Sequence, residues 1–253
     1  MGNMFDIQGQ KAIVTGGTRG LGRGMAEALL EAGCEVVIVG SSAKVAETAA
    51  GFREKGYICS AVQADLGKKG ELYAAFRSCM EKLGDLDILV TAHGITYRHQ
   101  PEEYPISEWD EVINVNLNSV FYLCQEAGKV MLKKGYGKII NISSMNAFFG
   151  GSVAPAYSAS KGGISQLTKA LSNDWAGKGI NVNAIAPGFM ATDLTAALWD
   201  PNNPRCKEIT DRIPSHRWGT PDDMKGITVF LASHASDYIS GAIIPVDGGY
   251  LVK

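Results

Sequence analysis

The sequence predicts a single α/β domain over residues 1–253, with a doubly wound parallel sheet of about seven strands and helices on both faces. Three observations support this prediction. Short runs rich in Val and Ile alternate with longer amphipathic segments, which indicates strands and helices that alternate along the chain. The runs are apolar on both faces, as central parallel strands are. No low-complexity linker or internal repeat divides the chain.

The predicted strands are the apolar runs at 11–15, 35–39, 57–62, 86–91, 138–143, 180–186 and 242–246. Helical segments lie between them, and three of these end at Gly33, Gly84 and Gly135, where a left-handed C-cap fits. Right-handed strand–helix–strand crossovers then give a parallel sheet. Residues 191–219 break the alternation, because "WDPNNPR" cannot lie inside a regular helix. We expect a substrate flap there, over one edge of the sheet.

Composition excludes several classes of protein. The net charge of −2 offers no attraction to nucleic acid or to an anionic membrane. Five scattered cysteines with no Cys-x-x-Cys pair or Cys/His cluster argue against a metal site and against a disulfide framework. The amino terminus has no apolar signal region, and no apolar run is long enough to span a bilayer. The expected compartment is the reducing cytoplasm.

The segment "TGGTRGLG", residues 15–22, follows the first predicted strand and opens the first predicted helix. Its glycines (Gly16, Gly20, Gly22) permit a tight turn and let backbone N–H groups approach a pyrophosphate at the helix N-terminus. A flexible strand–helix turn also uses glycine, but the strand–turn–helix context favours dinucleotide binding. The expected fold is therefore Rossmann-like.

The end of the second strand bears on the choice between NAD and NADP. An acidic residue there would bind the adenosine ribose, but the chain has Gly40, Ser41 and Ser42 instead. Without that carboxylate, the serines and Arg19 could accommodate a 2′-phosphate. The alternative is that these serines cap a loop and that Arg19 is solvated. The sequence therefore permits NADP without requiring it.

"PAYSASKGG", residues 155–163, places Tyr157 and Lys161 four residues apart, hence on one face of a helix. This pattern and the spacing T-G-x-x-x-G-x-G resemble the short-chain dehydrogenase/reductase family, and the resemblance runs from Gly9 to Gly249. Further shared motifs are "ADL" (64–66), "VNL" (115–117), "NISS" (141–144), "APG" (186–188) with Thr192, and "VDGG" (246–249). Chance does not explain so many motifs in the family's order.

The resemblance implies a catalytic set of Asn116, Ser144, Tyr157 and Lys161. Tyr157 would be the acid/base, Lys161 its partner, Ser144 the substrate-orienting hydroxyl and Asn116 the anchor of a relay water. Ketone reduction needs a proton on oxygen besides the hydride that the cofactor supplies. A phenol with a pKa of about 10 is a poor base, so we expect the positive charges nearby to lower the pKa of Tyr157.

The same resemblance implies the cofactor site, with Asp65 at the adenine and Thr192 at the nicotinamide carboxamide. The complete predicted set is Gly16, Thr18, Arg19, Gly20, Leu21, Gly22, Ser41, Ser42, Asp65, Leu66, His93, Gly94, Tyr157, Lys161, Pro187, Gly188 and Thr192. It also implies a homotetramer built on two long helices around 107–134 and 156–177.

One motif departs from the family pattern. After the fourth strand, Thr91-Ala92-His93-Gly94 replaces the usual Asn-Asn-Ala-Gly, and only the glycine matches. We expect Thr91 to tie the strand to its neighbours less well than asparagine would. His93 is either a ribose or acid/base contact or an ordinary packed strand-end residue.

Within the family, the chain resembles bacterial sugar-acid dehydrogenases acting on gluconate-type substrates, through residues 5–16, 144–145, 150–151, 180–192, 212–219 and 230–241. The predicted substrate residues are Arg98, Ser144, Met145 and Tyr157, with Arg98 binding a carboxylate. This resemblance favours NAD, whereas Arg19 and the two serines favour NADP, so both stay open. Other possible activities are 3-oxoacyl-acyl-carrier-protein reductase and hydroxysteroid dehydrogenase. A sensor that binds a dinucleotide without turnover is a further alternative.

Overall fold

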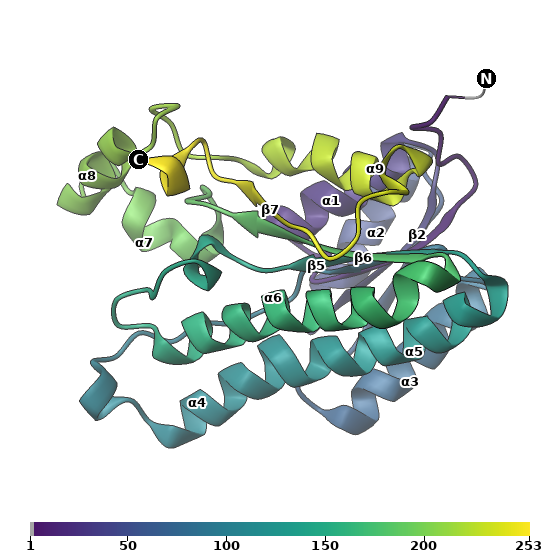
Figure 1. The fold of residues 1–253 in the computed structure, drawn as a ribbon, viewed down its shortest axis with the longest axis horizontal. Helices are drawn as coiled ribbons and strands as arrows, with labels where there is room; N and C mark the ends of the chain where they lie inside the picture. The colour runs from purple at the N-terminus through teal and green to yellow at the C-terminus, as the bar shows by residue number, and fades with distance from the viewer. Residues whose placement is uncertain (1–2) are drawn as a thin grey trace.

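The apolar runs pair into one parallel sheet, whose seven strands lie in the order β3-β2-β1-β4-β5-β6-β7 within residues 3–253, the part of the chain that this computed structural model describes. Figure 1 shows the sheet edge-on between two layers of helices. The strands are β1 (Lys11–Thr15), β2 (Glu35–Gly40), β3 (Cys59–Gln63), β4 (Ile88–Thr91), β5 (Gly137–Ile142), β6 (Ile180–Pro187) and β7 (Ile243–Val246). All seven predicted strands are confirmed, with ends shifted by at most two residues.

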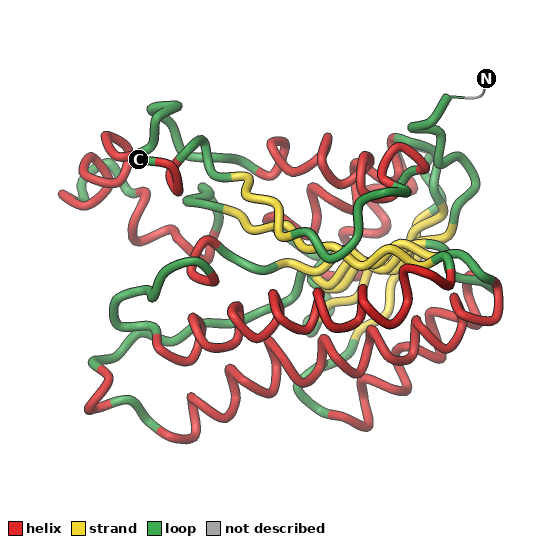
Figure 2. Tube along the Cα trace, in the orientation of Figure 1, coloured by secondary structure: helices red, strands yellow, loops and turns green. Residues whose placement is uncertain are grey.

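The helices cover both faces of this sheet, as Figures 1 and 2 show. On one face lie α1 (Gly20–Glu31), α2 (Lys44–Glu54) and α9 (Lys225–Ala232). On the other lie α3 (Lys69–Leu83), α4 (Ile106–Ile113), α5 (Ser119–Lys134) and α6 (Pro155–Trp175). The predicted doubly wound, Rossmann-like α/β fold is confirmed. The strand order reverses between β1 and β4, which is where ligands bind in sheets of this kind.

Alternate residues of each central strand enter opposite halves of the core. In β2, Val36 and Ile38 join the cluster under α1, while Val37 and Val39 join the cluster under α3 and α5. All four are fully or almost fully buried. This two-sided burial is why the strands are continuously apolar, and it makes the sheet a rigid platform for the side chains at its carboxyl edge.

The long helix predicted around 107–134 is interrupted. Between α4 and α5, residues Asn114–Asn118 form a π-helical turn. Within it, the Ser119 hydroxyl donates to the Val115 carbonyl at 2.6 Å. A side-chain donor that competes with the backbone in this way favours a local departure from the α-helix. The apolar periodicity of the segment gave no sign of the break.

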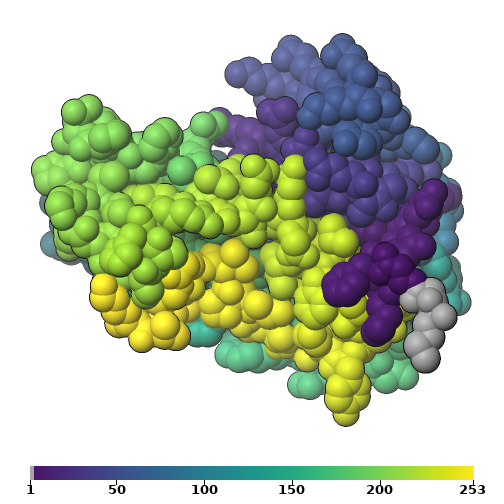
Figure 3. All heavy atoms as spheres, turned by 90° about the horizontal axis from the view of Figure 1, so that it is seen from above, coloured from purple at the N-terminus to yellow at the C-terminus, as the bar shows by residue number. Residues whose placement is uncertain are grey.

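Residues 191–219, the predicted flap, follow β6 beyond the carboxyl edge of the sheet. It contains α7 (Ala196–Trp199) and α8 (Pro204–Arg212), and a bridge between Met190 and Gly219 closes its base. Ile209 and Ile213 pack in one cluster with Met145 and Tyr250. Figure 3 shows the flap (green) beside the C-terminal residues (yellow) at one end of the molecule.

Thr91 ties β4 to its neighbour in the sheet. Its hydroxyl donates to Asn141 Oδ1 of β5 at 2.8 Å, and Asn141 in turn donates to Thr168 of α6 at 3.0 Å. All three side chains are buried, so this hydrogen-bonded series joins β4, β5 and α6.

Over residues 3–253, no helix has both the length and the apolar character needed to cross a membrane.

Candidate active site

The four predicted catalytic residues come from three neighbouring elements. Ser144 lies just beyond β5, Tyr157 and Lys161 lie in the first two turns of α6, and Asn116 lies in the π-helical turn. The Lys161 ammonium is 5.6 Å from the centre of the Tyr157 ring. A Cβ placed on Gly94, after β4, would lie 3.2 Å from Asn116 Oδ1 and 3.7 Å from Lys161 Nζ. The fold therefore brings all four residues to one place, next to Gly94.

The Tyr157 side chain is half-buried. Burial raises its pKa, while a hydrogen bond with Ser144 and the positive charge of Arg98 act in the opposite direction. The sequence alone predicts that nearby positive charge lowers this pKa. In the cofactor-free protein burial outweighs that effect, because an ionised phenol loses more hydration than the neutral form.

Lys161 is a buried ammonium without an acidic partner. It is 3% exposed, and its Nζ donates to the Ile142 carbonyl at 2.7 Å. No carboxylate forms an ion pair with it among residues 3–253. Burial lowers its pKa to about 8. At neutral pH the group is still mostly protonated, so it places a positive charge beside Tyr157.

Both polar atoms of the Asn116 side chain form hydrogen bonds within the protein. Its Oδ1 accepts from the Ile95 backbone N–H at 2.8 Å, and its Nδ2 donates to the Ile95 carbonyl at 2.9 Å and to the Ser160 hydroxyl at 3.1 Å. Ser160 in turn donates to the Tyr157 carbonyl at 2.8 Å. Asn116 thus joins the loop after β4 to the first turn of α6. Sequence reasoning missed Ser160, although it lies within the "YSASK" motif.

The glycine-rich turn is shaped to receive a phosphate group. A Cβ on Gly22 would lie 2.3 Å from the Gly16 carbonyl oxygen, and one on Gly16 would lie 2.8 Å from the backbone of residue 92. Between them, the Thr18 hydroxyl is buried with no hydrogen-bond partner. Such an orphaned donor requires a partner, and a cofactor phosphate would provide one. The turn therefore fits the pyrophosphate of a dinucleotide.

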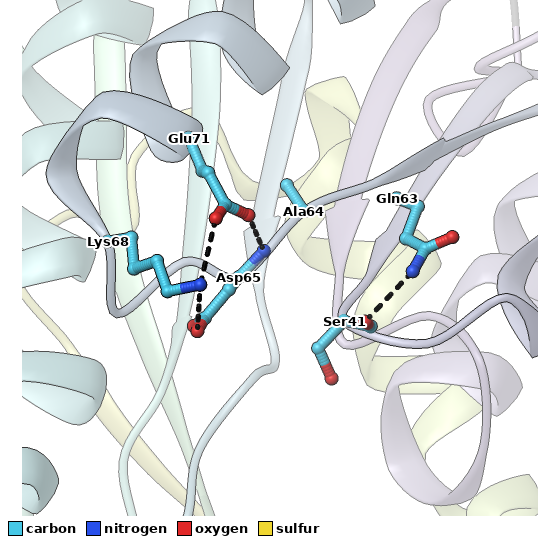
Figure 4. A pocket seen from close by; sticks show the side chains of 6 residues that line it. All are labelled: Ser41, Gln63, Ala64, Asp65, Lys68 and Glu71. Atoms are coloured by element: carbon cyan, nitrogen blue, oxygen red, sulfur yellow. Dashed lines mark hydrogen bonds and ion pairs between the residues drawn. The ribbon is translucent and has the colours of Figure 1, made fainter.

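The adenosine end of the predicted site is a cavity of about 470 Å³ after β2 and β3. Figure 4 shows its lining residues, which include Ser41, Asp65, Lys68 and Glu71. Glu71 accepts from the Asp65 backbone N–H at 2.9 Å and pairs with Lys68 at 3.0 Å. Ser42 and Leu66 continue the same two loops. Asp65 therefore lines a cavity beyond the carboxyl ends of β2 and β3, and its contact with the adenine stays a prediction.

The flap begins beside the glycine-rich turn. A Cβ on Gly20 would lie 3.8 Å from Thr192, which follows Pro187 and Gly188 at the end of β6. Arg19 forms an ion pair with Asp193 at 3.1 Å, and both side chains are largely exposed. The predicted phosphate-binding arginine is therefore held toward the flap. Leu21 packs against the core beneath α1.

Besides the predicted Arg98, other basic residues follow β4 or lie at the flap, and they separate from Arg98 by their partners. Arg217 pairs with Asp223 at 2.7 Å, His99 with Glu108 at 2.7 Å, and Arg212 stacks 4.2 Å from the Tyr250 ring. Arg98 is exposed and acts electrostatically on Tyr157. Met145 is buried against the flap. Of these arginines, Arg98 is the one whose positive charge acts to lower the pKa of the Tyr157 phenol.

These features agree with the comparisons to known proteins. A family model described as enoyl-(acyl carrier protein) reductase matches residues 16–251. The 2-dehydro-3-deoxy-D-gluconate 5-dehydrogenase of Bacillus subtilis is 44% identical over 249 residues, which is 98% of this chain and 97% of that protein. The chain belongs to the short-chain dehydrogenase/reductase family. It is an oxidoreductase of that family acting on CH–OH groups.

Solved structures of family members superpose over almost the whole chain. A putative NAD(P)-dependent gluconate 5-dehydrogenase from Beutenbergia cavernae, with NADP at low occupancy, has a TM-score of 0.96 and 40% identity over 99% of this chain and all of that one. A gluconate 5-dehydrogenase from Burkholderia cenocepacia, in complex with NADP and tartrate, has a TM-score of 0.94 and 35% identity over 99% and 98%.

The buried ammonium leads to a prediction about stability. Because the pKa of Lys161 falls from 10.5 to about 8 on folding, the folded chain loses this proton first as the pH rises. The free energy of unfolding of the cofactor-free wild type, relative to Lys161→Met, should rise between pH 8 and 10.5. The rise is at most about 3 kcal/mol, since one pKa unit corresponds to about 1.4 kcal/mol.

Urea unfolding of both proteins across this pH range measures the difference. Lys169→Met removes an exposed lysine of the same helix and is the matched control. A constant difference between the wild type and Lys161→Met would show that the ammonium is hydrated in the folded protein.

Proposed function

We propose that this protein is an NAD(P)-dependent dehydrogenase that interconverts a ketone and a secondary alcohol on a gluconate-type sugar acid. The observation that carries the proposal is the convergence of Tyr157, Lys161 and Ser144 beside a glycine-rich turn with an unpaired Thr18 hydroxyl. The sugar-acid relatives described above support the substrate class.

The proposed cofactor residues are those of the turn and of the strand ends. Backbone N–H groups around Gly16 and Gly20, with the Thr18 hydroxyl, would hold the pyrophosphate. Asp65 would bind the adenine and Thr192 the carboxamide. Ser41 lines the cavity at the adenosine end and brings no carboxylate to repel a 2′-phosphate. Binding of NADP is in line with the NADP in both superposed structures.

When bound, the nicotinamide supplies or accepts the hydride. The chain's own groups handle the oxygen and its proton. Ser144 and Tyr157 would both hydrogen-bond the substrate oxygen, and Tyr157 would donate or accept the proton. The positive charge of Lys161 would favour the phenolate once the phenol gives up its proton and would act against the effect of burial on the pKa of Tyr157.

We also propose that the enzyme is a cytoplasmic homotetramer that associates through α5 and α6. Phe121 on α5 is 38% exposed, and α6 presents the small residues Ala159 and Ala170 to solvent. Apolar and small surfaces of this kind allow helices of two subunits to pack closely. Light scattering should give the mass of four chains.

Tyr157→Phe should leave cofactor affinity intact and lower kcat by about 10²–10⁴, the range assigned to a positioned acid/base. The substitution removes only the hydroxyl, so packing is retained. Steady-state rates and cofactor binding by fluorescence give the two quantities. Tyr73→Phe on α3, away from the site, serves as the control. If the Tyr157→Phe enzyme keeps more than about a tenth of kcat, the proton moves through another group.

Ser41→Asp should shift cofactor preference toward NAD, because its carboxylate would repel a 2′-phosphate. Gly40 is the position of the missing acid, but a Cβ there would lie 2.1 Å from the Thr18 hydroxyl oxygen. Ser41 is exposed and avoids this clash. The ratio of kcat/KM for NAD and NADP is compared with that of the neutral, equally large Ser41→Asn. An unchanged ratio would place the adenosine ribose elsewhere.

Arg98→Gln should raise KM for a keto-gluconate far more than for an uncharged ketone of similar size. A guanidinium binds a carboxylate with two hydrogen bonds, which the amide cannot replace. Arg205→Gln, on the exposed side of α8, is the control. Equal losses on both substrates would remove Arg98 from carboxylate binding. Activity on acyl thioesters or steroids with none on any sugar acid would favour those substrate classes instead.

A further inference from the structure

His93 is one of the three residues at which the loop after β4 departs from the family pattern, and its imidazole lies between polar groups from two other elements. Nδ1 lies 2.6 Å from the Thr15 hydroxyl at the end of β1, and Nε2 lies 2.6 Å from the Ser119 hydroxyl at the start of α5. None of the proposed catalytic steps uses this side chain. It therefore calls for an explanation of its own.

The hydrogen bonds around the ring have one consistent direction. Both hydroxyls can also donate to a backbone carbonyl, Ser119 to Val115 at 2.6 Å and Thr15 to Val90 at 3.3 Å. Because the Ser119 bond is much the shorter, we assign the Ser119 proton to Val115, so that the Ser119 oxygen accepts from His93. The proton of the ring is then on Nε2, and Nδ1 accepts from the Thr15 hydroxyl. The result is one unbroken series, Thr15 to His93 to Ser119 to Val115.

This series ends in the π-helical turn that carries Asn116. Val115 precedes Asn116 directly, and residues 114–118 lack the regular α-helical hydrogen bonds. π-Helical turns are rare and interrupt the regular ladder of a helix, so contacts from outside the helix bear directly on the position of this one. The other end of the series is Thr15, in a strand buried between β2 and β4. The strand β1 is therefore the rigid support, and the hydrogen-bonded series holds the π-helical turn in place against it.

The imidazole is suited to this role because it stays neutral. Burial and the positive charge of Lys161 lower its pKa to about 3, although the Val115 carbonyl acts in the opposite direction. The tautomer of His93, and with it the direction of the hydrogen bonds in the series, is then constant over the pH range in which the enzyme works. A residue that titrated near neutral pH would lose its acceptor on protonation.

We propose that His93 is a positioning residue that anchors the π-helical turn to β1 and thereby sets the place of Asn116 against Ile95 and Ser160. This inference rests on the proposed function, in which Asn116 belongs to the catalytic set. The conformation of the glycine-rich turn does not depend on the His93 imidazole. Gly16 packs on the backbone of residues 92 and 93, and the Thr15 hydroxyl has the Val90 carbonyl as an alternative acceptor at 3.3 Å.

The test compares three variants in the full-length protein. His93→Leu keeps an apolar side chain but breaks both hydrogen bonds, Ser119→Ala breaks the last link, and His93→Gln retains one acceptor and one donor. The first two should lower kcat about tenfold, less than the roughly 10² that a 1 Å misplacement costs. NADPH affinity, measured by fluorescence, should change less than about twofold. His93→Gln should recover most of the rate.

Amide hydrogen exchange of the cofactor-free variants gives a readout independent of any reaction. Exchange of residues 114–119 should quicken in His93→Leu and in Ser119→Ala but not in His93→Gln, while residues 11–15 stay protected. The double variant His93→Leu/Ser119→Ala should be no worse than either single one, because one series is broken only once.

Two results would overturn the proposal. One is unchanged exchange of residues 114–119 in both His93→Leu and Ser119→Ala. The other is a loss of kcat in His93→Leu that is just as large in an Asn116→Ala background, since the effect would then bypass Asn116. Failure of the sugar-acid proposal looks different: exchange responds as expected while no sugar acid is turned over.

Discussion

The buried ammonium of Lys161 is the constraint on which the arrangement of the site depends. A charge removed from water is costly unless other groups compensate for it, and here the hydrogen bond to the Ile142 carbonyl is the compensation that the structure shows. That contact requires α6 to lie against the carboxyl end of β5. Once it does, Tyr157, one turn earlier, faces Ser144 just beyond the same strand. The position of the Tyr157 phenol thus follows from the place at which the Lys161 ammonium can be buried with a hydrogen-bond acceptor.

Polar side chains around the site are also hydrogen-bonded to one another. Asn116 and Ser160 are joined by hydrogen bonds between the loop after β4 and α6, and Thr91 and Asn141 join the two strands beneath them. Each of these buried groups is satisfied, as a rigid polar network requires. Exposed elements lie around this rigid centre. Arg98 and the flap are at the rim, where substrate would enter.

Much of this could be predicted from the sequence, because the relevant signals are local. The strands are apolar runs, the glycine turn and the Tyr157–Lys161 pair are short spacings, and the flap is marked by prolines. What could not be predicted depends on contacts between distant residues. Arg19 meets Asp193, 174 positions away, and His93 meets Thr15 across 78 positions. The π-helical turn was missed because one inserted residue hardly changes the helical periodicity of its flanks. The pKa of Tyr157 was misjudged because charge can be read from sequence, while desolvation cannot.

The central claim is that this chain transfers a hydride between a nicotinamide and the carbonyl carbon of a keto-sugar acid. Its most direct test is to supply reduced cofactor carrying deuterium at the transferable position, together with a keto-gluconate, and to analyse the product by mass spectrometry and NMR. The account predicts one deuterium, on the new carbinol carbon, in a single configuration. Product without deuterium at that carbon, or no product from any keto-sugar acid while another ketone acquires the label, would contradict it.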